Sequence, residues 1–184
     1  KVVLGAAGVL TVAIGFAAQT SASNLISGLF LIVERPFGIG DIIDVDRFRG
    51  EVLAIDLLSC RIRTPDNLHV RIPNETMVKS SIVNRSFFPI RRAEVLVGVS
   101  YKADARNVQA ILLEICKQES MVLANPAPQC LFDGCGASSI DFKLFAWGKI
   151  DNVDEIPTRL RERIKARLEQ EKIEIPYPHQ VILS

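Results

Sequence analysis

The first part of the chain is a long apolar segment without a single ionisable side chain. It runs over residues 2–33 and is ended by the charged and helix-breaking residues 34–36. About 20 apolar residues suffice to cross a bilayer as a helix, whereas 32 residues would extend about 48 Å, well beyond a hydrocarbon core of about 30 Å. We therefore predict a membrane helix that breaks at its most polar stretch, residues 19–24. The residues expected at the kink are Gln19, Thr20 and Ser21.

Helical spacing separates this segment into faces. Val9, Val12, Phe16 and Gln19 fall on one apolar stripe that ends in an amide. Both flanks of the stripe carry small residues, which let neighbouring membrane helices approach closely. These residues are Gly8 and Gly15 on one flank and Ala6, Ala13 and Ala17 on the other. The pattern is typical of a ring of identical helices with the stripe at its axis, where an apolar constriction excludes water and ions.

The same spacing also fits an ordinary span rich in alanine and glycine, with its large residues facing lipid. Gln19 favours the ring, because an amide in hydrocarbon is costly unless it meets water or a partner. The following apolar residues 25–33 could lie in the membrane interface or pack beneath the bilayer.

Beyond residue 36 the pattern changes to short strands separated by turn residues, as in a small β barrel or sandwich. A turn at residues 65–67 separates the last two strands, and Pro73 and Asn74 are expected to end the final strand and cap a turn. The predicted strands are 41–45, 50–57, 60–64 and 69–72.

From residue 93 the elements alternate in the order of a ferredoxin-like α+β domain. Apolar residues recur at helical spacing in both predicted helices and give each helix a core face. The predicted order is strand 94–99, helix 104–120, strand 129–132, strand 139–146, helix 154–172 and strand 180–183.

Charge and cysteine content narrow the class of protein. The 22 basic and 21 acidic residues give a net charge of +1, and all of them except Lys1 lie after residue 33, so no nucleic-acid patch is indicated. The four cysteines follow no CxxC spacing and are interpreted as reduced thiols. Because Lys1 is not a methionine and no signal peptide follows it, we expect further membrane spans upstream.

Catalytic, metal and cofactor motifs are not indicated. His69 and His179 lie far apart without a spaced ligand set, and 134–136 is interpreted as a turn rather than a dinucleotide loop. Arg35, Asp41 and Asp44 could suggest an ion site, but charged residues just past a span are more often interfacial anchors. We expect neither an enzyme nor a bound metal or cofactor.

Ordered motifs along the whole chain resemble the family of the mechanosensitive channel of small conductance (MscS). Near the membrane segment they are Gly15-Phe16-Ala17-Ala18-Gln19, Ser23-Asn24-Leu25, Gly28 and Arg35-Pro36-Phe37-Gly38-Ile39-Gly40-Asp41. Further along they are Gly50-Glu51-Val52, Arg63-Thr64, Ile72-Pro73-Asn74, Val97-Gly98-Val99-Ser100-Tyr101, Gly136-Ala137-Ser138-Ser139 and Ile175-Pro176-Tyr177-Pro178.

The resemblance implies a homoheptamer whose last membrane helix lines the pore, kinks and leads to a cytoplasmic vestibule. Aligned on Gln19, the two apolar rings of the family's closed seal fall on Val12 and Phe16, where leucines are common. The resemblance makes Pro36, Phe37 and Gly40 structural residues of the turn into the β domain. A glycine often found at the family's kink is Thr20 here, which affects where the helix bends and how easily it gates.

The expected organisation has four parts: a pore helix at 1–33, a β domain at 34–92, the ferredoxin-like domain at 93–178, and a strand at 179–184 for a small barrel at the base of the vestibule. The expected function is a tension-opened channel in a bacterial-type cell membrane, multi-pass, with its C-terminal region in the cytoplasm. It would interact with the bilayer and pass ions and small osmolytes on hypo-osmotic shock, without nucleic acid. A ligand-modulated channel or signalling assembly, and a membrane scaffold, are the alternatives.

Overall fold

The computed structural model describes residues 2–177 and divides the chain into two compact units, 1–87 and 88–184. The boundary lies five residues before the one predicted at 92/93. Its position follows from strand β6, which begins at Ile90 and pairs entirely within the second unit.

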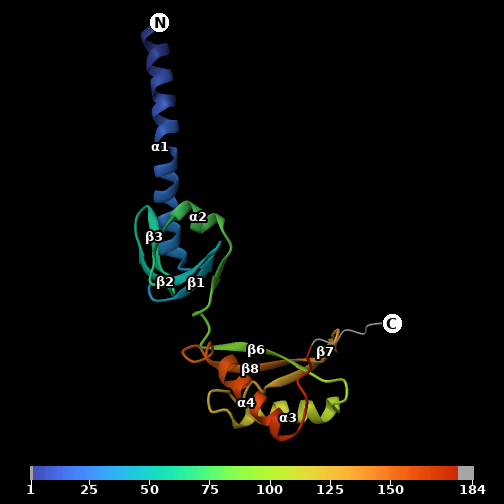
Figure 1. Cartoon of the computed structure of the whole chain (residues 1–184). Helices are drawn as coiled ribbons and strands as arrows, with labels where there is room; N and C mark the ends of the chain where they lie inside the picture. Colours follow the sequence, from blue (N-terminus) through green and yellow to red (C-terminus); the bar gives the residue numbers. More distant parts are fainter. Residues whose placement is uncertain (1, 178–184) are drawn as a thin grey trace, which may run out of the picture. The chain divides into compact units, whose positions relative to one another are not determined.

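The first unit consists of a long helix followed by a small antiparallel β domain (Figure 1). Five strands are ordered β4-β3-β2-β1-β5 in one sheet, and a short helix lies between β4 and β5. The elements are α1 (Val2–Glu34), β1 (Ile42–Val45), β2 (Phe48–Ile55), β3 (Ser59–Arg63), β4 (His69–Pro73), α2 (Asn74–Lys79) and β5 (Ile82–Asn84). The four predicted strands are present with ends shifted by at most two residues, whereas α2 and β5 were not predicted.

Helix α1 is uninterrupted from Val2 to Glu34, so the predicted break at residues 19–24 is wrong. The residues assigned to the kink, Gln19, Thr20 and Ser21, lie within the helix. The polar side chains of this stretch do not end the helix, because Asn24 donates from Nδ2 to the Thr20 carbonyl (2.8 Å) and so folds back on its own turn. No proline follows until Pro36, after the helix has ended.

The core of the first unit forms where the end of α1 meets the sheet. Leu31 of α1 and Phe37 of the following turn are buried together with side chains from β1, β2, β3, β4 and α2. The cluster comprises Leu31, Phe37, Ile43, Val45, Val52, Cys60, Ile62, Ile72 and Met77. The last turns of α1 are therefore part of the β domain rather than a separate membrane-surface segment.

The second unit is a three-stranded antiparallel sheet with two helices. Its strands are ordered β6-β8-β7; β8 pairs with β6 along its whole length and with β7 over residues 140–145. The elements are β6 (Ile90–Val99), α3 (Ala105–Gln118), β7 (Gln129–Cys135), β8 (Ile140–Lys149) and α4 (Ile156–Gln170). This is the β-α-β-β-α portion of a ferredoxin-like domain; the predicted final strand, 180–183, lies outside the described residues.

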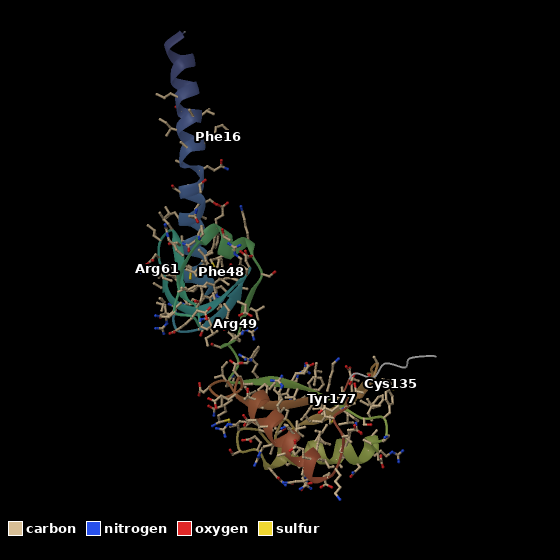
Figure 2. All side chains as sticks on the ribbon, in the orientation of Figure 1. Phe16, Phe48, Arg49, Arg61, Cys135 and Tyr177 are labelled. Atoms are coloured by element: carbon tan, nitrogen blue, oxygen red, sulfur yellow. The ribbon has the colours of Figure 1, made fainter. Side chains whose placement is uncertain are left out.

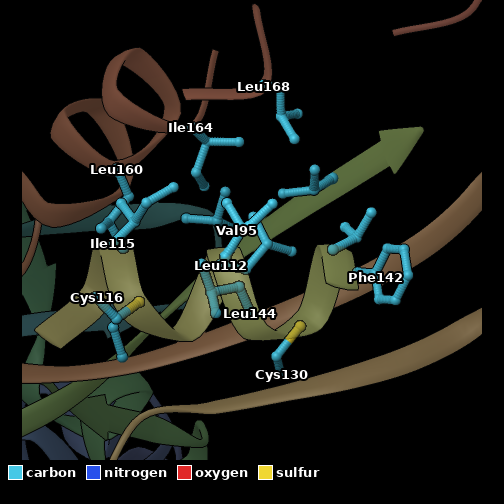
Figure 3. Packing of buried hydrophobic residues seen from close by; sticks show 14 of the residues in the cluster. Val95, Leu112, Ile115, Cys116, Cys130, Phe142, Leu144, Leu160, Ile164 and Leu168 are labelled. Atoms are coloured by element: carbon cyan, nitrogen blue, oxygen red, sulfur yellow. The ribbon is translucent and has the colours of Figure 1, made fainter. Parts of the chain in front are cut away.

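One side of this sheet is covered by α3 and α4, and the core lies between them (Figure 3). Alternate residues of β6, including Val95, meet the predicted apolar face of α3, with Leu112 and Ile115, and that of α4, with Leu160 and Ile164. The helix faces predicted from the sequence are thus the ones that form the core.

Candidate functional site

The N-terminal part of α1 stands apart from the β domain. All of residues 10–22 are exposed in the single chain, and most of them are apolar. By length and composition, residues 10–34 could cross a membrane. Because water would meet these apolar side chains in an isolated chain, this part of the helix requires lipid or other helices around it.

The predicted stripe forms a continuous face of α1. Val12, Phe16 and Gln19 line one shallow hollow along the helix together with Gly15, Ala22, Ser23 and Ile26. Phe16 is 72 % exposed and projects from the free part of α1 (Figure 2). The stripe therefore continues for two turns beyond Gln19, where the sequence pattern predicted that it ends.

The small residues beside the stripe leave open space. A Cβ added at Gly8 or Gly15 would meet no atom within 4 Å, and Ala13 and Ala17 are exposed. The side chains of Ala6 and Val9 are not among those that the structure describes. No atom of the described residues occupies the space beside these glycines, so it is open to a neighbouring helix.

The C-terminal half of α1 is held in the β domain by polar contacts. Asn24 is 7 % exposed and uses both ends of its amide: Nδ2 binds Thr20, and Oδ1 accepts a hydrogen bond from the backbone N–H of Glu75 (3.0 Å). Glu75 lies in the first turn of α2 and forms an ion pair with Lys79. Hydrogen bonds from Lys79 and from Ser23 of α1 hold the pKa of the Glu75 carboxyl below its ordinary value.

Gly28 lets α1 approach the β2–β3 turn closely. A Cβ at this position would lie 2.5 Å from Nδ2 of Asn74 and 2.6 Å from the carbonyl oxygen of Leu57. Asn74 is fully buried and donates from Nδ2 to the Asp56 carbonyl (2.9 Å). The side chain of Asn74 therefore fixes the β2–β3 turn rather than capping α2, which corrects the predicted capping role.

The turn that follows α1 brings the chain into the sheet. Phe37 is 2 % exposed in the core, and Gly40 has a φ of +93°, which a residue with a side chain rarely adopts. The Gly40 N–H donates to the Val52 carbonyl (2.8 Å). Asp41 accepts hydrogen bonds at Oδ2 from the Gly38 N–H and from Asn84 Nδ2, both at 2.8 Å.

The acidic residues after the span are paired rather than free to hold an ion. Asp44 forms ion pairs with Arg49 (2.9 Å) and Arg85 (2.5 Å). The hydrogen bond from Arg85 is the main reason why the pKa of the Asp44 carboxyl lies below its ordinary value. Within the described residues no group of three metal-ligating side chains occurs. The two ion pairs of Asp44 link β1 to β2 and to the residue that follows β5.

The described chain thus combines a long, mostly apolar helix that is anchored in a β domain with a separate α+β unit. Comparison with family models identifies both parts. The model described as "Mechanosensitive ion channel, beta-domain" matches residues 20–86, and "Mechanosensitive ion channel MscS, C-terminal" matches residues 93–175.

Relatives along nearly the whole chain carry the same family name. An MscS family protein of Archaeoglobus fulgidus is 38 % identical over 179 residues, which are 97 % of this chain and 63 % of the relative. The small-conductance mechanosensitive channel of Edwardsiella ictaluri is 33 % identical over 90 % of this chain and 58 % of its own length. The chain thus spans about three fifths of these curated relatives.

A solved structure matches both units. The crystal structure of Helicobacter pylori MscS in its closed state has a TM-score of 0.96 and 27 % identity, and the match covers 100 % of this chain and 73 % of that one. Arabidopsis thaliana MSL1 shares the fold, with a TM-score of 0.80 at 20 % identity. The chain belongs to the MscS family of mechanosensitive channels.

Proposed function

We propose that the chain is the pore-forming part of a subunit of a homoheptameric channel that membrane tension opens. The channel lies in the cell membrane as a multi-pass protein, its C-terminal region is cytoplasmic, and it releases ions and small osmolytes on hypo-osmotic shock. One observation carries the proposal: a free helix face with Val12 and Phe16, on a chain that matches a closed MscS structure over its whole length.

Val12 and Phe16 form the seal of this pore. They lie one turn apart on the same face of α1, and both are more than half exposed in the single chain. Seven copies of this face around an axis place two apolar rings one above the other, and a narrow apolar ring blocks ions by excluding water. Val9 and Gln19 continue the lining, and Gly8, Gly15, Ala6, Ala13 and Ala17 form the contacts between helices.

Tension opens the pore through membrane area. An open ring occupies more area than a closed one, so tension multiplied by the area difference supplies the free energy that shifts the equilibrium. The helices tilt or rotate, Val12 and Phe16 leave the axis, and water enters. No ionisable side chain lies in residues 2–33, so the channel discriminates weakly between ions.

The test is excised-patch recording of the full-length protein in liposomes under stepped suction. Unitary currents that appear only under suction, from a protein whose native mass is that of a heptamer, support the proposal. Current that depends on a soluble ligand rather than on suction would favour a ligand-controlled channel. Silence up to patch rupture, with the assembled ring confirmed in the same liposomes, would favour a scaffold.

A further inference from the structure

A second hollow lies beside α1 within the first unit, where the helix enters the β domain. It is lined by Thr20, Ser21, Asn24, Leu58, Arg71 and Pro73. Four of these side chains carry hydrogen-bond donors, and none is a carboxylate. A hollow with a guanidinium, two hydroxyls and no acid has the chemistry of an anion site.

Arg71 is held in place but lacks a counter-ion. Its Nε donates to Oγ of Ser59 (2.9 Å), which leaves the two terminal guanidinium nitrogens available. Within residues 2–177 no carboxylate forms an ion pair with Arg71. The hydroxyls of Thr20 and Ser21 likewise have no hydrogen-bond partner among the described residues.

The sheet sets Arg71 directly opposite a second arginine. In the β3–β4 pairing the partner of Arg71 is Arg61, and like charges directly opposite each other are unfavourable. Arg61 is neutralised by Asp56 (2.8 Å), and it does not line the hollow. An anion at Arg71 would relieve the repulsion that remains.

The position of the hollow along α1 indicates which anion is available. Thr20 and Ser21 lie where the exposed, mostly apolar part of α1 (residues 10–22) ends and the polar contacts of Ser23 and Asn24 with α2 begin. With the exposed part of the helix in the bilayer, as the proposed function places it, Thr20 and Ser21 fall at the membrane surface, where the phosphates of the lipid headgroups lie. The exposed side chain of Leu58, in the β2–β3 turn, lines the same hollow. An arginine fork fits the oxygens of a phosphate, and an apolar side chain next to it suits an acyl chain.

We propose that this hollow binds the phosphate of an anionic phospholipid, with Arg71 as the cation and Thr20 and Ser21 as hydroxyl donors. The inference rests on the proposed function, because the proposed function places α1 in a bilayer. It assigns to the β domain a direct contact with a lipid headgroup.

The experiment is lipid titration of the full-length ring in detergent, followed by native mass spectrometry. Phosphatidylglycerol, phosphatidylcholine and inorganic phosphate are added separately to the wild type, Arg71→Gln and Arg61→Gln. Arg61→Gln is the matched control, because it removes the same charge at the directly opposite position outside the hollow. Arg71→Gln is expected to weaken phosphatidylglycerol binding about tenfold, and Arg61→Gln less than twofold.

A second variant keeps the test independent of the arginine. Thr20→Val with Ser21→Ala removes both hydroxyls from the hollow and is expected to weaken phosphatidylglycerol binding several-fold with the ring intact. Equal losses in the two arginine variants, or none in either, would overturn the site. Inorganic phosphate that binds through Arg71 while phosphatidylglycerol does not compete would overturn the lipid as its source. Because binding is read without current, a silent channel that still loses lipid with Arg71→Gln contradicts tension gating and not this site.

Discussion

At the scale of single residues, the absence of a side chain at Gly28 determines how closely α1 approaches the β domain. The atoms that a Cβ would meet are backbone at Leu57 and a buried amide at Asn74. The Asn74 amide is already committed to the Asp56 carbonyl, so it is not free to move aside. Gly28 is therefore as much a packing residue as Leu31, one turn further along the helix.

Gly28→Ala is expected to lower the free energy of unfolding of the β domain by about 1–3 kcal/mol, because the added methyl overlaps fixed atoms. The measurement is chemical unfolding of the solubilised protein. Gly38→Ala is the control, since the nearest atom to its Cβ would be 3.9 Å away. Equal stability of the two variants would contradict the close approach at Gly28.

Asp44 is expected to make stability dependent on acidic pH. Its pKa is lowered in the folded protein, so the stabilisation is present above its ordinary value of 3.8 and is lost as the pH falls through the folded value. Asp44→Asn should therefore cost about 1 kcal/mol at pH 7 and progressively less below pH 3.8.

The control for Asp44 is Asp46→Asn, two residues further on. Asp46 is exposed and forms no ion pair with a described residue. Unfolding is followed at pH 7 and pH 3 for both variants. If Asp44→Asn lowers the free energy of unfolding by the same amount at both pH values, the ion pairs with Arg85 and Arg49 do not account for the loss of stability.

At the scale of elements, α1 is one continuous helix with an exposed N-terminal part and a C-terminal part that packs into the β domain. Residues 10–22 are exposed and mostly apolar, whereas Asn24, Ser27 and Leu31 are buried where the helix meets the β domain. The helix continues without a break because Asn24 bonds both to its own helix turn and to α2. A displacement of the exposed part of α1 is thus mechanically connected to the β domain.

Phe16→Ser is expected to lower the suction at which the channel opens, or to give a leak at rest, because a hydroxyl allows water into the constriction. Patch recording of half-maximal opening measures this effect. Phe16→Leu should open near the wild-type suction, since it keeps an apolar side chain at the seal.

Ile14→Ser is the matched control on the opposite face of the same helix turn, where Ile14 is similarly exposed. It introduces the same hydroxyl away from the stripe and should leave the resting pore closed. If Phe16→Ser and Ile14→Ser open at the same suction, Phe16 is not part of the seal.

At the scale of the whole molecule, the four cysteines differ sharply in exposure. Cys60, Cys116 and Cys130 are buried in the cores of the two units, and Cys135 is exposed at the end of β7. Burial raises the pKa of Cys60 and Cys130 to about 11 and that of Cys116 to about 12, so thiolate is scarce at neutral pH.

Cys135 alone among these four is expected to react rapidly with N-ethylmaleimide at pH 7.5 in the folded protein. All four should react after denaturation. Peptide mapping by mass spectrometry reads each site separately, so cysteines elsewhere in a longer chain do not interfere. Rapid labelling of Cys60 or Cys116 without denaturant would contradict the packed cores.

Sequence periodicity predicted the elements wherever one face of an element is buried. The apolar positions predicted for α3 and α4 are residues of the core. The same reasoning missed α2 and β5, which are only six and three residues long and so carry too little pattern. It also read residues 19–24 as a break, because polar residues that cap helices bond equally well inside one.

The sequence by itself determined the charge-free apolar segment with its stripe, the β region, the α+β region and the family, because these depend on composition, motifs and regular spacing. Tertiary structure decided where α1 is anchored and what surrounds Arg71. The residue pairs involved lie about fifty positions apart in the sequence: Asn24 and Glu75 share a hydrogen bond, and Thr20 and Arg71 line one hollow. No local periodicity encodes such pairs, since they exist only once the fold has brought α2 and the sheet against the helix.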